Sequence, residues 1–319
     1  MSTLVFLEHK DSNIQKGSLG VLSKAVANDA DTAAVLIGSG VSALADKAKQ
    51  YGAAKVYVVD DAAFASPLPQ PRVDAIEQIV KDNGIDTVLF GASVLSADIA
   101  GGLSARLDAG LNWDLNDISG SGDSLVGKRA ALGDSVVVDV AWNSTPRIGM
   151  FRAGSFDPVE SAGAGEVVAV SPSTQDFSGT TTLVGQTSPE TTGPAIEDAD
   201  ILVTGGRGLG SAEAFNIVED LAAALGGAVA STRAVVDSGW YPYATQIGQT
   251  GKVVSPKLYV GCGVSGAIQH KVGMQSSQTI VAINKDANAP IFDFADLAVV
   301  GDVHQVVPAL SAKVKERKG

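Results

Sequence analysis

One stretch decides the fold: Leu258-Tyr259-Val260-Gly261-Cys262-Gly263-Val264-Ser265-Gly266-Ala267-Ile268-Gln269-His270. It begins as an apolar, strand-like run, passes through glycines spaced as GxGxxG, and continues into a predicted helix. A glycine turn between a strand and a helix lets backbone N–H groups approach a phosphate. The next strand ends in Ile283-Asn284-Lys285-Asp286, without the acid that would hold the ribose of a nicotinamide cofactor. The stretch therefore favours a nucleotide-binding domain but not a standard NAD site.

Two other segments carry similar chemistry. The apolar run 201–204 leads into Gly205-Gly206-Arg207-Gly208-Leu209-Gly210-Ser211, and a helix with apolar residues on one side follows. Arg207 adds a charge suited to a phosphate or a carboxylate, although such glycines could equally serve only a tight turn. The loop Gln246-Ile247-Gly248-Gln249-Thr250-Gly251-Lys252 is rich in hydrogen-bonding groups and lacks a nucleophile–base pair. Taken alone, it could also be a solvated hairpin.

The rest of the chain alternates strand and helix patterns. Strands are predicted at 4–7, 33–37, 55–59 and 87–90, with amphipathic helices after the third and the fourth. This alternation predicts mainly parallel sheets. Between 125 and 156, strand follows strand without a helix, including 135–142 and 147–152, which predicts an antiparallel addition. Residues 171–198 are polar and read as a linker, with strand-like periodicity only at 181–184. We therefore expect two α/β domains, 1–190 and 191–319, the second of them Rossmann-like.

Composition excludes several classes of protein. The 319 residues are 45% hydrophobic and 18% charged, and the net charge of −12 argues against a nucleic-acid partner. Cys262 is the only cysteine and the three histidines lack metal-ligand spacing, so we expect neither a disulfide nor a metal site. No apolar run approaches the ~18 residues of a membrane span, and the N-terminus does not look like a secretory signal. The expected location is the cytoplasm, with no membrane insertion.

These segments together resemble the electron-transfer flavoprotein alpha subunit family. The resemblance rests on the opening stretch, on Gly205-Gly206-Arg207-Gly208, Thr232-Arg233 and the 248–252 loop, and on Ile283-Asn284-Lys285-Asp286. It implies a heterodimer with a beta subunit, which could carry AMP or a second flavin, and non-covalent FAD in the second domain. It further implies electron transfer from acyl-CoA and related dehydrogenases of fatty acid beta-oxidation to a membrane quinone oxidoreductase. The chain would then be an electron carrier without catalytic residues of its own.

The resemblance also implies a set of cofactor-binding residues. Arg233 would lie against the flavin ring, Thr250 near N5 and His270 on the O2 side. The remaining implied contacts are Arg207, Thr232, Gln246, Ile247, Gly248, Gln249, Gly263, Ser265, Gly266, Ala267, Ile268, Gln269, Asn284, Asp302 and Val303.

The chain departs from the family pattern at two places. Thr232 stands where serine is common, and it keeps the hydroxyl. After Ser93, the residues Ser96-Ala97-Asp98 replace a glycine–arginine–aspartate motif, so we expect the first domain to serve as scaffold. The alternative hypothesis is a non-redox module that binds an adenine nucleotide for regulation or assembly. A flavin dehydrogenase with its own substrate is a third possibility, disfavoured because no catalytic base is evident.

Overall fold

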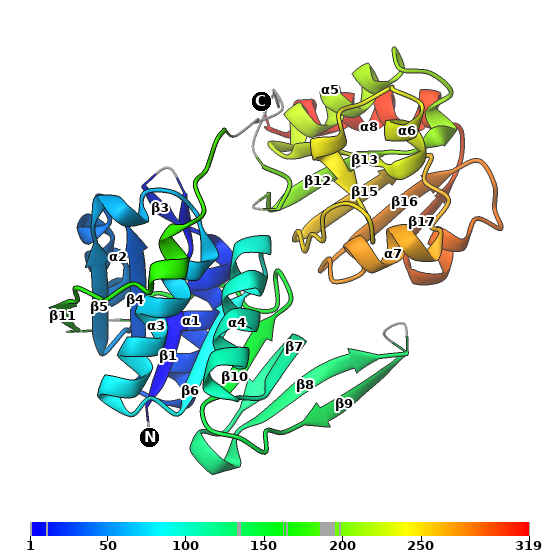
Figure 1. Ribbon diagram of the computed structural model, residues 1–319. Helices are drawn as coiled ribbons and strands as arrows, with labels where there is room; N and C mark the ends of the chain where they lie inside the picture. Colours follow the sequence, from blue (N-terminus) through cyan, green and yellow to red (C-terminus); the bar gives the residue numbers. More distant parts are fainter. Residues whose placement is uncertain are drawn as a thin grey trace. The chain divides into compact units, whose positions relative to one another are not determined.

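A computed structural model of the chain describes residues 2–10, 12–132, 135–161, 163, 165–185, 195–197 and 199–318. The chain divides into two compact units, residues 1–186 (unit 1) and 187–319 (unit 2) (Figure 1). The predicted domain boundary at residue 190 lies outside the described residues.

Unit 1 is built on one large sheet. Its described strands run in the order β11-β5-β4-β1-β6-β10-β7-β8-β9, and neighbours are parallel from β11 to β7 and antiparallel from β7 to β9. The bounds are β1 Thr3–Phe6, β4 Ala33–Gly38, β5 Lys55–Asp60, β6 Thr87–Gly91, β7 Leu111–Ser119, β8 Val126–Ala131, β9 Val136–Val140, β10 Arg147–Phe151 and β11 Glu166–Ala169. A small hairpin joins β2 (His9–Lys10) to β3 (Asn13–Ile14).

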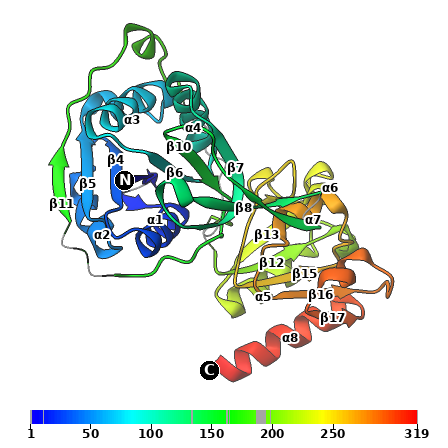
Figure 2. The ribbon, with the colours of Figure 1, turned by 90° about the horizontal axis from the view of Figure 1, so that it is seen from below.

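Helices cover both faces of this sheet (Figure 2). They are α1 Lys16–Asn28, α2 Ala45–Gln50, α3 Pro69–Asn83 and α4 Val94–Leu107. In β1, Leu4 and Phe6 enter the core beneath α3 and α4, whereas Val5, and Leu7 just after the strand, enter the core beneath α1 and α2. A strand buried on both faces in this way reads as a continuous apolar run, which is typical of parallel sheets.

Several predictions for unit 1 need correction. The antiparallel pair β8–β9 is confirmed, but the predicted strand at 147–152 is not part of it: β10 lies between β6 and β7 and is parallel to both. All five residues of β10 are buried, as befits a central strand. The prediction had no strand at β7 or at β11. Residues 181–184 form no regular element.

The first part of the predicted linker packs on unit 1. The amide of Gln175 donates to Oδ2 of Asp74 at 3.0 Å, and the Phe177 ring lies 4.9 Å from the guanidinium carbon of Arg106. Asp74 and Arg106 belong to α3 and α4, so residues 175–179 are tied to these helices. The segment predicted as linker therefore begins as part of the unit 1 surface.

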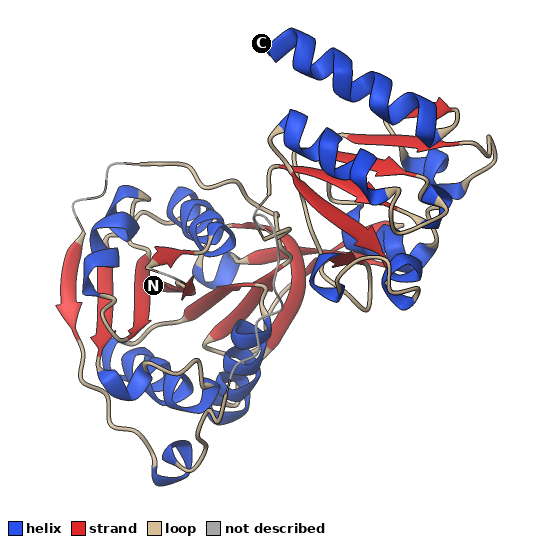
Figure 3. Cartoon of the chain, turned by 90° about the horizontal axis from the view of Figure 1, so that it is seen from above, coloured by secondary structure: helices blue, strands red, loops and turns tan. Residues whose placement is uncertain are grey.

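Unit 2 is a single parallel sheet flanked by helices (Figure 3). Its strands are β12 Ile201–Gly205, β13 Ala228–Thr232, β14 Gln246–Ile247, β15 Leu258–Cys262, β16 Ile280–Asn284 and β17 Leu297–Val300. Their order is β14-β13-β12-β15-β16-β17, which is 3-2-1-4-5-6 when the strands are numbered within the unit. Doubly wound dinucleotide-binding folds have this order.

The helices of unit 2 are α5 Phe215–Leu225, α6 Arg233–Asp237, α7 Ile268–Met274 and α8 Val303–Lys318. One core includes Phe215 and Leu221 of α5 with Val307 of α8, and a second includes Tyr259 of β15 with Met274 of α7. The predicted α/β class with mainly parallel sheets is confirmed in both units. In the described part of the chain, every helix is too short or too polar to cross a membrane.

Candidate functional site

The candidate site lies at the carboxyl edge of the unit 2 sheet. Strands numbered 1 and 4 within the unit, β12 and β15, are neighbours at its centre, so the chain turns to opposite sides after them. Ligands of open α/β sheets bind outside the carboxyl ends of the strands at such a switch point.

All the residues predicted to bind a cofactor follow a strand at this edge or end one. Arg207 follows β12, Thr232 and Arg233 end β13 and begin α6, and Gln246 to Thr250 form β14 and its turn. Residues 263–267 join β15 to α7, and Ile268, Gln269 and His270 form the first turn of α7. Asn284 ends β16, while Asp302 and Val303 lead from β17 into α8. The structure thus brings segments 95 residues apart in sequence (302 minus 207) to one edge of one sheet.

These residues differ in how they face solvent. Among them Gln246, Ile247, His270 and Val303 are buried, so their side chains belong to the interior. The exposed members are Arg207, Arg233, Gln249, Thr250, Ser265, Ala267, Ile268, Gln269 and Asp302. A ligand at this edge would meet the exposed group first.

The two glycine turns touch each other through their backbones. The amide of Gly206 donates to the carbonyl of Cys262 at 2.9 Å, and that of Gly208 to the carbonyl of Gly263 at 3.0 Å. A Cβ at Gly206 would lie 2.3 Å from the Gly263 oxygen, and Gly263 itself has a φ of +67°. Glycine is therefore required at these two positions by contact between the turns, a reason that the sequence pattern alone did not reveal.

Two arginines bring positive charge to this edge. Arg207 is exposed, and within the described chain its side chain has no hydrogen bond or ion pair. Arg233 is also exposed, and its Nε lies 3.3 Å from Oδ2 of Asp237, one helical turn away. An exposed ion pair of this kind contributes little stability, so the Arg233 guanidinium can leave Asp237 for an anion, as the Arg207 guanidinium can bind one directly.

The turn after β14 is held in one shape by short contacts. Nε2 of Gln246 donates to Oγ1 of Thr250 at 3.2 Å, and the hydroxyl of Tyr243 donates to the Thr250 carbonyl at 2.9 Å. The amide of Gln249 donates to the carbonyl of Gln269 at 2.7 Å, which ties the turn to the start of α7.

His270 is buried, with 7% of its surface exposed, and both of its ring nitrogens have partners. Nδ1 lies 3.2 Å from the Ile247 carbonyl, and Nε2 lies 2.8 Å from the hydroxyl of Tyr259. Burial lowers the pKa of His270 to about 4, so the ring is neutral at physiological pH. Sequence reasoning placed His270 near a ligand but missed Tyr259, whose signal was a phenol in an otherwise apolar strand, where the hydroxyl needs a partner.

Cys262 is fully buried, and burial raises the pKa of its thiol to about 12. Cys262 is therefore a buried structural residue at the end of β15. At the end of the neighbouring strand β16, Nδ2 of Asn284 donates to the Val264 carbonyl at 2.9 Å. Oδ1 of Asp302 accepts from the His304 amide at 2.9 Å and so caps α8.

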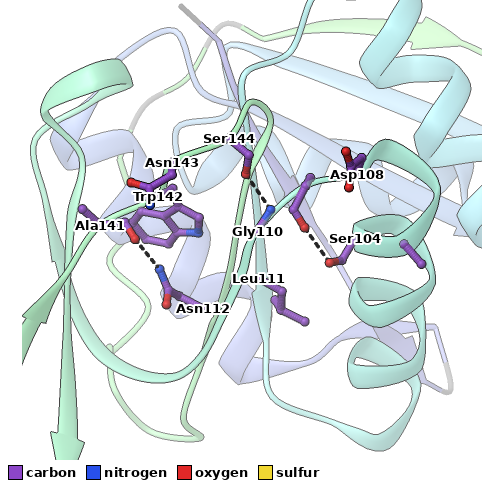
Figure 4. A pocket seen from close by; sticks show the side chains of 11 residues that line it. Ser104, Asp108, Gly110, Leu111, Asn112, Ala141, Trp142, Asn143 and Ser144 are labelled. Carbon is purple, nitrogen blue, oxygen red and sulfur yellow. Dashed lines mark hydrogen bonds between the residues drawn. The ribbon is translucent and has the colours of Figure 1, made fainter.

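Unit 1 offers two other places, neither of which contains a predicted site residue. At the carboxyl ends of β1 and β6, the carboxylate of Glu8 accepts hydrogen bonds from Ser93, Ser96 and Gln15, so an internal anion fills this position. A surface hollow of about 600 Å³ lies beside the end of α4 (Figure 4). Its polar lining groups bond to one another, as Gly110 does to Ser144 and Asn112 to Ala141.

Fold and site together define a two-unit α/β protein whose second unit has the strand order of dinucleotide-binding folds. The family model "Electron transfer flavoprotein domain" matches residues 3–175, and "Electron transfer flavoprotein FAD-binding domain" matches residues 195–275. The electron transfer flavoprotein subunit alpha of Mycobacterium leprae is 41% identical over 99% of both chains, and that of Syntrophomonas wolfei is 39% identical over 98% of this chain and 99% of the relative. The mitochondrial subunit alpha of Oryza sativa is 35% identical over 100% of this chain and 92% of the relative.

The chain belongs to the electron transfer flavoprotein alpha-subunit family. The resemblance stated from the sequence is thereby confirmed.

Proposed function

We propose that this chain is the alpha subunit of a heterodimeric electron carrier that binds FAD non-covalently at the carboxyl edge of unit 2. The single observation that carries the proposal is the convergence at this edge of unpaired positive charge, polar side chains and backbone turns. FAD, when bound, would supply the capacity to take up and release electrons.

The residues at the edge fit such a cofactor. Arg207 has a guanidinium group without a partner in the described chain, suited to a pyrophosphate, and it lies beside a turn whose backbone approaches closely. Gln249, Thr250 and Ser265 present amide and hydroxyl groups that can hydrogen-bond to a polar ring edge. Arg233 would bring a permanent positive charge that favours the negative charge gained on reduction.

The same edge is poorly suited to substrate chemistry. His270 is neutral, buried and bonded at both nitrogens, and the thiol of Cys262 is buried and protonated. Neither group is placed to exchange a proton with a substrate. This supports a carrier rather than an enzyme with its own substrate.

Several further assignments belong to the proposal. The partner is a beta subunit, which carries AMP or a second flavin. Electrons come from acyl-CoA and related dehydrogenases of fatty acid beta-oxidation and leave to a membrane quinone oxidoreductase, with the carrier in the cytoplasm. Unit 1 serves as scaffold. In support of this, the Glu8 carboxylate, bonded to Ser93 and Ser96, occupies the carboxyl edge of the unit 1 sheet.

The test is co-expression of the chain with a beta subunit, followed by purification and an absorption spectrum. The proposal predicts a yellow heterodimer that releases FAD on denaturation. Arg207→Ala should weaken FAD binding about tenfold or more, since a charge-assisted contact is lost. Arg317→Ala, in the last turn of α8, is the matched control and should leave binding unchanged. A colourless complex that releases only an adenine nucleotide would support the non-redox module instead.

A further inference from the structure

The proposed FAD-binding edge includes the turn 248–251, which is held in part by residues of the neighbouring helix α7. The turn 248–251 presents Gln249 and Thr250. Its Thr250 end is bonded to Gln246 and Tyr243, and at its Gly248 end the Gly248 amide donates to the Lys252 carbonyl at 3.1 Å. Gly248 has a φ of +137°, a conformation that glycine adopts readily and other residues rarely do.

Helix α7 supports the turn. The amide of Gln249 donates to the Gln269 carbonyl at 2.7 Å, and a Cβ on Gly273 would lie 2.4 Å from the Gly248 nitrogen, so helix and turn are in backbone contact. The carbonyl of Ile247, directly before the turn, faces Nδ1 of His270 at 3.2 Å. Among the described residues, the His270 ring is therefore the one side chain of α7 that bonds to the backbone at the start of the turn.

The position of the ring is fixed by Tyr259. A carbonyl can only accept, so the hydrogen of the neutral imidazole is on Nδ1, and Nε2 must accept from the Tyr259 hydroxyl, 2.8 Å away. Tyr259 is fully buried in β15, at the centre of the sheet, and His270 is 7% exposed. Hydroxyl, ring and carbonyl form a directional chain from the rigid sheet to the ligand-binding turn.

We propose that Tyr259 and His270 are positioning residues, which hold the 248–251 turn through the Ile247 carbonyl and so set how Gln249 and Thr250 meet the ligand. This inference rests on the proposed function only for the identity of the ligand. The pair acts through the turn and not through a change of charge, since burial keeps the pKa of His270 low.

The first test uses the full chain without FAD. Because the chain has three histidines, ¹⁵N-histidine labelling gives three ring systems, and His270→Gln identifies the signals of His270. The native chain should show the Nδ1–H tautomer at neutral pH. Tyr259→Phe should increase the hydrogen exchange of the Gln249 amide about tenfold, because the hydrogen bond that orients the ring is lost. An Nε2–H tautomer, or unchanged exchange at Gln249, overturns the inference whatever the ligand is.

The second test uses the FAD-loaded heterodimer. Tyr259→Phe should weaken FAD about tenfold. The matched control is Tyr57→Phe in unit 1, which removes another buried hydroxyl, bonded to Asn83 at 2.9 Å, and should leave FAD affinity unchanged. His270→Gln keeps a donor for the Ile247 carbonyl and should retain more affinity than His270→Leu. Equal affinities of the Tyr259 and Tyr57 variants would overturn the inference, whereas a native complex without FAD would overturn the proposed function alone.

Discussion

Acid should destabilise unit 2 through His270. The pKa of the buried ring is about 4, against about 6.5 for a histidine in the unfolded chain. Between these values the unfolded state binds more protons than the folded state, so the free energy of unfolding rises with pH. The stability that depends on a neutral His270 is complete above about pH 6.5 and is lost as pH falls toward 4. Lowering the pH from about 7.5 to 5 should cost about 2 kcal/mol.

The chain contains its own reporter of this loss. Cys262 is the only cysteine, and it is fully buried in unit 2, so a thiol reagent that works in acid labels it only when unit 2 opens. The urea concentration at which half of Cys262 is labelled measures the stability of that unit. With a slope of about 2 kcal/mol per molar, the midpoint should fall by about 1 M between the two pH values.

His270→Gln tests whether the histidine is responsible. This variant lacks the titrating group, so its midpoint should vary with pH by about 1 M less than that of the native chain. His304→Gln, on the exposed surface of α8, is the control and should behave like the native chain. The reasoning is refuted if the native midpoint is the same at both pH values, or if His270→Gln loses as much stability in acid as the native chain.

Four other substitutions test the packing of unit 1 and the carboxyl edge of the unit 2 sheet. Asp74→Ala removes one of the two carboxylates bonded to Arg106 and leaves Glu77, so it should destabilise unit 1 by about 1.5–3 kcal/mol, measured by urea unfolding followed by tryptophan fluorescence. Gly206→Ala puts a methyl group against the turn after β15, so Cys262 should become labelled at a lower urea concentration. Gly17→Ala, in α1 with open space around it, should instead stabilise unit 1 by about 0.5–1 kcal/mol. Arg233→Ala in the FAD-loaded heterodimer should lower the first reduction potential by about 60–130 mV in a potentiometric titration. Thermal stability should change little, because the ion pair of Arg233 with Asp237 is exposed. An unshifted potential would contradict this role of Arg233.

Apolar runs bounded by turns were enough to predict most of the strands. β1, β4, β5 and β6 are continuous apolar runs, and a parallel sheet buried on both faces requires this pattern. β7 escaped prediction because Leu111–Ser119 alternates with Asn and Asp, which are uncommon in strands. The direction of β10 could not be predicted, because a short apolar run has the same pattern in a parallel and an antiparallel neighbour.

The candidate site, like the fold, could be predicted from the sequence only in part. The glycine turns and the residues that end each strand were visible in the sequence, because turn chemistry is local. The sequence did not show that Gly206 and Gly263 meet, or that His270 is bonded to Tyr259, because these contacts depend on the order of strands in the sheet. The assignment of the site residues to FAD stays a prediction.

The backbone contact between the turns after β12 and β15 also limits how the site can evolve. No side chain can be added at Gly206 or Gly263 without forcing the two turns apart. These two positions therefore have almost no freedom to change during evolution. Changes in ligand preference are therefore expected at the exposed side chains around this contact, such as Arg207, Arg233 and Ser265, while the backbone of the two central turns stays the same.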